Sequence, residues 1–166
     1  MHETTEDIAQ LQQTLDASME RAGPFLREAF EMPDRSLSAR QIIDYYDQPR
    51  TVALATVTAR GEPRVAPIWS IMLRGQFYIP TVATAARTRH LAQRPGVSFT
   101  LYMGNDLAII VHGQARLIRE NDALFTELET LLHTMSGQRV SDWGEGVYIQ
   151  ILAETIYTFQ RNSEEG

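Results

Sequence analysis

From Thr51 onward the sequence alternates short β-prone segments with tight turns, and this alternation limits the possible folds more than any other feature. The β-prone segments are 51–58, 64–73, 76–79, 97–102, 107–118, 147–152 and 155–159. Turns that contain Gly61, Gly75 or Gly104 join neighbouring segments, as is typical of β-hairpins. Because one short helix is predicted between the third and fourth segments, we predict a mainly β fold, a small antiparallel barrel with flanking helices, rather than a parallel α/β sheet.

The rest of the chain carries helical patterns. The predicted helices outside the barrel segments are 5–22, 24–31, 39–46 and 122–135. In the first of them apolar residues recur every three or four positions, and a Gly-Pro pair ends it. Ser38 is predicted to cap the third, and either Asn121 or Asp122 the last. We therefore divide the chain into an N-terminal helical extension, residues 1–36, and a barrel domain, residues 37–166.

The segment 77–95 combines the end of a strand with the start of a short helix. Thr84 is predicted to be the N-cap of a helix over 85–93, because a side-chain oxygen there accepts a hydrogen bond from the first turn. Arg87 then lies in the first turn of the helix and Arg89 in the second. The positive end of the helix dipole disfavours cations at this place, so the two arginines indicate a bound anion.

A phosphate group at this helix start would be bound by free backbone N–H groups and by a charge-assisted hydrogen bond from Arg87. The hydroxyls of Thr81, Thr84 or Thr88 would add further hydrogen bonds. Arg87 and Arg89 point about 200° apart, since each helical residue turns by roughly 100°, so they do not converge from one face. The alternative is an ordinary surface helix with two solvated arginines.

Two predicted strands contain a residue that interrupts regular pairing. Pro67 cannot donate a backbone hydrogen bond, so it marks an edge, a bulge or a place where the backbone faces something other than a strand, such as a planar ligand. Gly113 indicates a bulge or a close approach of another backbone segment.

Charge and residue content exclude several classes of function. The formal net charge of −6 argues against a nucleic-acid or anionic-membrane surface as the main partner. The sequence contains no cysteine, which excludes disulfides, thiolate catalysis and Cys-ligated metal sites. The amino terminus is acidic, and no apolar run approaches the roughly 18 residues of a membrane span. We therefore predict a soluble, cytoplasmic protein.

Motifs for other chemistries are missing from the sequence. The four histidines, His2, His90, His112 and His133, are far apart and lack the spacing of a metal site. His112 is predicted to be a surface or rim residue, with a role as an axial haem ligand as the alternative. No nucleophile elbow, phosphate-binding Gly-rich loop or dinucleotide-binding fingerprint occurs, so hydrolase and nucleotide-fold functions lack support.

Several segments, taken in order, resemble the pyridoxamine 5′-phosphate oxidase-like, FMN-binding split-barrel family. The similar segments are 55–57, 61–69, 76–81, 85–91, 94–98 and 111–115. The resemblance covers about residues 37–159 and rests on the ordered set at family-like spacing rather than on one motif. It implies a six-stranded antiparallel split β-barrel and a homodimer with the cofactor in a groove between the subunits.

The resemblance also implies a flavin- or deazaflavin-dependent oxidoreductase that transfers a hydride to or from a small molecule. FMN is the first expected cofactor and the deazaflavin coenzyme F-420 the alternative. The expected cofactor-binding residues are Arg64, Pro67, Ile68, Trp69, Pro80, Thr81, Arg87, Thr88 and Arg89. No side chain is singled out as a catalytic acid or base. A non-catalytic cofactor- or haem-binding protein with the same fold remains the alternative function.

The sequence departs from the family pattern at several places. The phosphate-binding Ser-Arg-Lys run of the family corresponds to residues 85–87, so that only the last cation is kept as Arg87. Trp69 and Ala108 stand where true pyridoxamine phosphate oxidases carry a lysine and a glutamine. The chain ends in acidic residues rather than in a basic substrate-binding motif. These departures argue against vitamin B6 oxidation and favour the broader branch that uses FMN or F-420.

Overall fold

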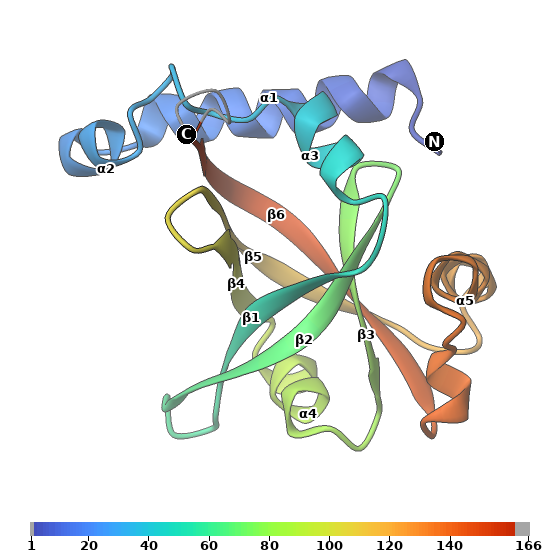
Figure 1. Cartoon of the computed structure of the whole chain (residues 1–166). Coiled ribbons are helices and arrows are strands. Elements are labelled where there is room, and N and C mark those ends of the chain that lie inside the picture. Colours follow the sequence, from blue (N-terminus) through green and yellow to red (C-terminus); the bar gives the residue numbers. More distant parts are fainter. Residues whose placement is uncertain (1, 162–166) are drawn as a thin grey trace.

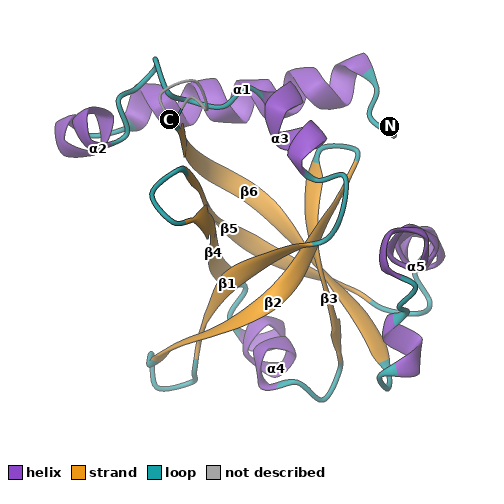
Figure 2. Ribbon diagram, in the orientation of Figure 1, coloured by secondary structure: helices purple, strands orange, loops and turns teal. Residues whose placement is uncertain are grey.

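The structure is a computed structural model and describes residues 2–161. Its centre is a closed barrel of six antiparallel strands (Figures 1 and 2), in the order β1-β2-β3-β6-β5-β4, which confirms the predicted fold class. The strands are β1 (Arg50–Val57), β2 (Pro63–Leu73), β3 (Gln76–Val82), β4 (Gly96–Met103), β5 (Leu107–Ile118) and β6 (Gly146–Gln160). The acidic carboxyl end at residues 164–166 lies outside the described residues.

The last two predicted strands form one continuous strand, β6, so their separation was wrong. The register between β5 and β6 shifts between His112 and Gly113, so Glu154 of β6, which lies between the two predicted strands, has no partner on β5. A Cβ atom on Gly113 would lie 2.1 Å from the carbonyl oxygen of Leu152, so the two backbones approach too closely for any side chain. The sequence offered a bulge or a close approach at Gly113; the close approach is confirmed, and a bulge is present with its extra residue in β6 opposite Gly113.

One seam of the barrel is short. β1 pairs along its whole length with Pro63–Ser70 of β2, whereas β2 pairs with β3 only over Ile71–Leu73. The rest of β3 pairs with β6 up to Val82. The barrel closes through this short seam, but residues 63–70 of β2 and 79–82 of β3 do not pair with each other. Pro67 lies on this unpaired edge, which is one of the placements that the sequence allows.

The helices cover the two ends and one side of the barrel (Figure 1). They are α1 (Thr5–Arg21), α2 (Pro24–Ala29), α3 (Ala39–Tyr45), α4 (Ala86–Gln93) and α5 (Ala123–Ser136), with a 3₁₀ turn, η1, at Val140–Asp142. Side chains of Ser38 and Asp122 cap α3 and α5, as predicted. None of the helices in residues 2–161 is both long and apolar enough to cross a membrane.

The amino-terminal helices pack directly on the barrel. Leu11 and Leu15 of α1 and Ile42 of α3 belong to the same buried cluster as the interior side chains of the strands, for example Phe77 and Ile149. The Ser18 hydroxyl accepts a hydrogen bond from the backbone N–H of Ile156 in β6 at 3.0 Å. The division of the chain at residue 37 stays a prediction.

The other two helices lie close to the open seam. α4 contacts β1 and β5, and its Leu91 is buried in the barrel core, as predicted. α5 buries Leu128 and Leu132 in a second apolar cluster with Ile71 of β2 and Tyr148 of β6. The loop after α5, residues 137–145, leads back to β6 and contains η1.

Candidate functional site

The open seam between β2 and β3 forms a cleft of about 410 Å³, which we name the seam cleft. It is lined by Ile68, Trp69, Pro80, Thr81, Val82, Arg87, Gln138 and Trp143. Two edges of the barrel form its walls, α4 contributes the arginine, and the loop after α5 contributes the last two residues. The lining is mainly apolar and aromatic with few polar groups, which is typical of small-molecule sites.

Two prolines explain why the seam stays open. If the observed register of β2 and β3 continued beyond Ile71 and Tyr78, Trp69 would pair with Pro80 and Pro67 with Val82. Each of these pairs contains a residue without a backbone N–H, so the ladder loses a hydrogen bond at both positions. The local sequence therefore ends the pairing where the cleft begins.

A second cleft of about 350 Å³ lies beside α4, and we name it the α4 cleft. It is lined by Leu54, Thr56, Thr58, Arg64, Val65, Ala66, Ala86, Arg87 and His90. Arg64 and Arg87 bring two guanidinium groups to this cleft from different elements. Arg87 also lines the seam cleft, so its side chain lies where the two clefts meet.

Arg87 has unused capacity for an anion. Its Nη1 donates to the hydroxyl of Thr81 at 3.2 Å, and no carboxylate in residues 2–161 forms an ion pair with it. No described residue accepts a hydrogen bond from the backbone N–H of Ala86 or Arg87 in the first turn of α4. An unpaired guanidinium beside free N–H groups is a donor set that suits a phosphate.

The predicted cap of this helix was wrong. The N-cap of α4 is Ala85 rather than Thr84, and no side chain caps the helix. β3 continues to Val82, which moves the start of the helix one residue further along the chain. A side chain from within the helix, Thr88, joins α4 to the end of β3: its buried hydroxyl donates to the carbonyl oxygen of Val82 at 2.8 Å.

The structure brings together most of the expected cofactor-binding residues. Ile68, Trp69, Pro80, Thr81 and Arg87 line the seam cleft, and Arg64 and Arg87 line the α4 cleft. Pro67, Thr88 and Arg89 line neither cleft: the first and last are exposed, and Thr88 is buried. Arg64 is partly engaged, since it forms an exposed ion pair with Glu62 at 2.9 Å.

His90 is the histidine at the site. Its Nδ1 lies 2.9 Å from the hydroxyl of Thr56, and the ring forms part of the wall of the α4 cleft. His112 lies elsewhere, exposed on β5, with its Nδ1 2.6 Å from the hydroxyl of Ser98. Within residues 2–161 no group of three or more His, Asp or Glu side chains is arranged to hold a metal ion.

Gln138 and Trp143 were missed as site residues. Both belong to the loop 137–145, and the indole Nε1 of Trp143 donates to the Gln138 side chain at 3.3 Å. Trp143 is 43% exposed despite its size. A tryptophan in a polar, glycine-containing loop was the available signal, because a large aromatic side chain in such a loop is often held for binding.

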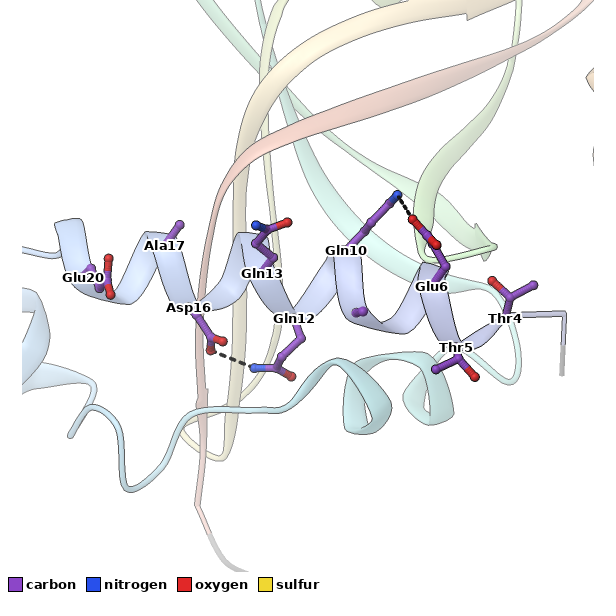
Figure 3. Close-up of a pocket in the computed structure, with 10 residues that line it drawn as sticks. Thr4, Thr5, Glu6, Gln10, Gln12, Gln13, Asp16, Ala17 and Glu20 are labelled. Carbon is purple, nitrogen blue, oxygen red and sulfur yellow. Dashed lines mark hydrogen bonds between the residues drawn. The ribbon is translucent and has the colours of Figure 1, made fainter.

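A larger hollow along α1 is not a comparable site (Figure 3). Its lining residues all come from one helix or its cap and are mostly carboxylates, amides and hydroxyls, including Glu6, Gln10 and Asp16. The outer surface of a single helix has no opposing wall, so it is an open surface and does not enclose a ligand.

The comparisons with known proteins agree with this fold. The sequence model of the family described as pyridoxamine 5′-phosphate oxidase matches residues 39–158. The chain belongs to the pyridoxamine 5′-phosphate oxidase family. The matched range includes all six strands except the last residues of β6, and both clefts lie within it. No curated protein matches the sequence significantly.

Solved structures share the family fold. A conserved hypothetical protein from Mycobacterium tuberculosis superposes with a TM-score of 0.66 at 23% identity, covering 77% of this chain and 88% of that one. HutZ, described as the haem storage protein from Vibrio cholerae, superposes with a TM-score of 0.59 at 16% identity, covering 76% of this chain and 97% of HutZ. An F420 reductase superposes with a TM-score of 0.56 at 15% identity, covering 68% of this chain and 93% of the reductase. At these identities the likeness concerns the fold.

Proposed function

We propose that this family member is an oxidoreductase that uses FMN or the deazaflavin coenzyme F-420. The observation that carries the proposal is the position of Arg87, an arginine at the start of α4 that has no carboxylate partner among the described residues. It lies where the α4 cleft, which also contains Arg64, meets the apolar and aromatic seam cleft. In this arrangement the phosphate end of the cofactor lies against Arg87 and the first turn of α4. The planar ring lies in the seam cleft beside Trp69.

The residues present suit such a cofactor. Arg87 and the N–H groups of Ala86 and Arg87 supply donors to the phosphate, and Arg64 extends the positive surface along the α4 cleft. The bound flavin or deazaflavin supplies the atoms that accept or donate a hydride. The seam cleft contributes orientation and the exclusion of water through Ile68 and Trp69, and none of its lining side chains is a carboxylate or a histidine.

Titration of the purified protein with FMN and, separately, with F-420 tests the proposal. Saturable binding of one of them, followed by its oxidation or reduction in the presence of a substrate, would support an oxidoreductase. A chain that binds neither cofactor at micromolar concentrations would overturn it.

The second candidate is a protein that binds a cofactor or haem without catalysis. The absence of an acid or base among the residues that line the seam cleft favours it, because proton transfer to a substrate would have no donor there. HutZ shows that a protein of this fold is described as storing haem. Tight binding without turnover over a broad substrate panel would support this candidate.

We also propose a homodimer that closes the α4 cleft. Val65 in the wall of this cleft is 70% exposed, and Tyr102 at the end of β4 is 65% exposed. Val65 and Tyr102 lie on β2 and β4, which both pair with β1, and large exposed apolar side chains mark surfaces for association. Light scattering measures the mass in solution.

A further inference from the structure

The loop 137–145 is the wall of the seam cleft that does not belong to the barrel or to α4. It supplies Gln138 and Trp143 to the cleft. Its own hydrogen bonds are local, such as the one from the backbone N–H of Trp143 to the carbonyl oxygen of Val140 at 2.9 Å. Contacts with the rest of the protein must therefore fix the position of this wall.

A buried carboxylate on α5 makes most of the polar contacts that hold the loop. The side chain of Glu129, only 8% exposed, accepts hydrogen bonds from the backbone N–H of Val140 at 2.9 Å and from the Ser141 hydroxyl at 2.8 Å. It also accepts a longer one from the Ser141 N–H at 3.4 Å. The Tyr148 hydroxyl of β6 donates to it at 2.5 Å. Glu129 thus joins α5, η1 and β6.

The bonds keep this carboxylate ionised. Burial raises the pKa of Glu129, but its hydrogen bonds with Tyr148, Val140 and Ser141 together lower it further, so the net shift is downward. Burial and the bond to Glu129 raise the pKa of the Tyr148 hydroxyl, which therefore stays protonated and donates. A charged acceptor that meets several donors forms stronger hydrogen bonds than a neutral one.

Two other contacts hold the ends of the loop. The carbonyl oxygen of Glu145 accepts from the N–H of Ala83 at 2.8 Å, next to the cleft residues of β3. The Val140 side chain is fully buried, and a Cβ on Gly146 would lie 2.4 Å from it. Trp143 lies between these two fixed points, with Glu129 bound to the residues just before it.

We propose that Glu129 is a positioning residue that holds the loop 137–145 against the seam cleft and so controls ligand affinity without touching the ligand. Glu129 lines neither cleft, and its effect passes through Val140 and Ser141 to Trp143. The statement about ligand affinity rests on the proposed function, whereas the position of the loop can be measured without any ligand.

The first test uses the ligand-free protein. Glu129→Gln keeps the shape of the side chain but replaces one acceptor oxygen by an NH₂ donor, so one pair of its donors loses its partner. We expect hydrogen exchange of the Val140 and Ser141 amides to rise roughly tenfold or more, because one charge-assisted bond is lost. Exchange in the barrel core should not change.

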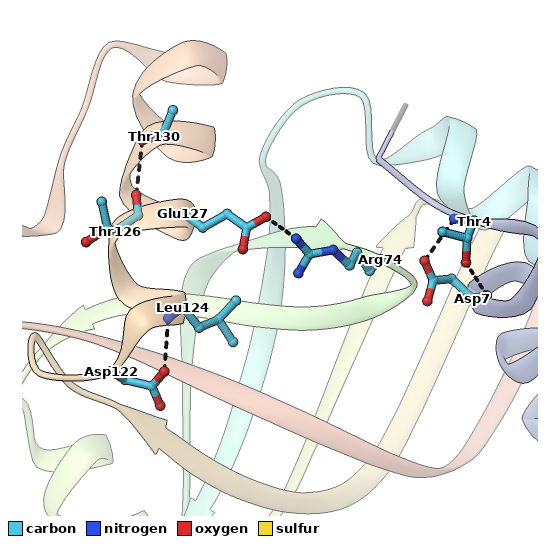
Figure 4. A network of polar contacts seen from close by, with 8 residues as sticks. All are labelled: Thr4, Asp7, Arg74, Asp122, Leu124, Thr126, Glu127 and Thr130. Atoms are coloured by element: carbon cyan, nitrogen blue, oxygen red, sulfur yellow. Dashed lines mark hydrogen bonds and ion pairs between the residues drawn. The ribbon is translucent and has the colours of Figure 1, made fainter.

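Tryptophan fluorescence gives an independent readout. The sequence has two tryptophans, Trp69 and Trp143, so a Trp69→Phe background leaves Trp143 as the sole reporter. In that background Glu129→Gln should increase the quenching of Trp143 by acrylamide. Glu127→Gln is the matched control, since Glu127 lies on the same helix but pairs with Arg74 at the surface (Figure 4).

The second test adds FMN and, separately, F-420 to each variant. For whichever cofactor the wild type binds, Glu129→Gln should weaken affinity by roughly tenfold, and Glu127→Gln should not change it. If Glu129→Gln does not fold, Ser141→Ala removes one of the bonds from an exposed residue and should shift the same readouts less.

The outcomes separate the two proposals. Unchanged exchange and quenching in Glu129→Gln would show that Val140 burial and the Glu145 contact alone hold the loop, and would overturn the role of Glu129. A loosened loop with unchanged cofactor affinity would overturn the control of binding. If the wild type binds neither cofactor, the proposed function fails, and the exchange and quenching results alone decide whether Glu129 positions the loop.

Discussion

Replacing Arg87 by alanine removes a side chain that lines both clefts, so it tests the proposed cofactor site directly. A charge-assisted hydrogen bond to a phosphate contributes about 1.5–3 kcal/mol. Because each 1.4 kcal/mol is roughly a factor of ten, Arg87→Ala should weaken cofactor binding by about ten- to a hundredfold. The loss should be smaller if the free N–H groups of α4 supply most of the phosphate contacts.

The effect of Arg87→Ala on folding should be small, because two contributions oppose each other. The bond from Arg87 to the buried Thr81 hydroxyl is long, 3.2 Å, and its loss costs about 0.5–1.5 kcal/mol. Removing a cation from the positive end of α4 returns about 0.3–1 kcal/mol. The melting temperature of the ligand-free protein should therefore change by no more than about 2–4 °C.

Fluorescence titration with FMN and F-420, together with melting curves with and without ligand, measures both effects. Arg89→Ala is the matched control, since it removes the same charge from the same helix at an exposed residue outside both clefts. It should leave affinity nearly unchanged. Equal affinities of wild type and Arg87→Ala would refute the reasoning and show that Arg87 is an ordinary residue of α4.

Three further predictions concern the barrel, the buried carboxylate and the dimer. Gly113→Ala should lower the free energy of unfolding by at least about 1–3 kcal/mol in urea denaturation, because the added Cβ would meet the Leu152 carbonyl oxygen at 2.1 Å. The pKa of Glu129 is lowered from 4.5, so its stabilising contribution is present above that pH and is lost as the pH falls through the lower folded value. The stability difference between wild type and Glu129→Gln should therefore shrink as the pH falls below 4.5. Val65→Glu should convert a dimer into a monomer in light scattering, because it buries a charge at the proposed contact.

Each of these has a result that would contradict it. Gly96→Ala is the control for Gly113→Ala, because a Cβ atom on Gly96 meets nothing within 4 Å. Equal losses of unfolding free energy in both variants would show that the close approach to Leu152 does not cause the destabilisation. A stability difference for Glu129→Gln that persists into strong acid would show that its charge is not involved. A wild-type monomer that still binds cofactor at micromolar concentration would refute a groove shared between subunits.

Local signals in the sequence were sufficient for much of the fold. The caps at Ser38 and Asp122 are short-range features, so the starts of their helices could be predicted from neighbouring residues alone. Gly113 and Pro67 could also be interpreted without knowing their neighbours in space, since Gly113 lacks a side chain and Pro67 lacks a backbone N–H. They indicated where regular pairing is interrupted before any partner strand was known, although the kind of interruption stayed open at both.

Long-range contacts explain what could not be predicted. The cap of α4 depends on how far β3 continues, and β3 is extended by pairing with β6 up to Val82. The loop with Trp143 is held at the cleft by long-range contacts: α5 packs on the barrel, Glu129 binds Val140 and Ser141, and the Glu145 carbonyl oxygen accepts from the N–H of Ala83. The sequence did contain a signal for Glu129, because it is a carboxylate on the apolar stripe of α5, four residues after Phe125. Its hydrogen-bond donors lie 11 to 19 residues further along the chain, so they could not be identified from neighbouring residues.

The prolines at the open seam also bear on how the protein avoids aggregation. An unpaired strand edge is a template on which a strand of another molecule can add. In this barrel two such edges face the seam, and Pro67 and Pro80 each remove a hydrogen-bond donor from one of them. Substituting either proline by a β-branched residue would restore a hydrogen-bond donor to its edge. With both prolines in place, this barrel keeps a cleft between two strands while both edges resist intermolecular pairing.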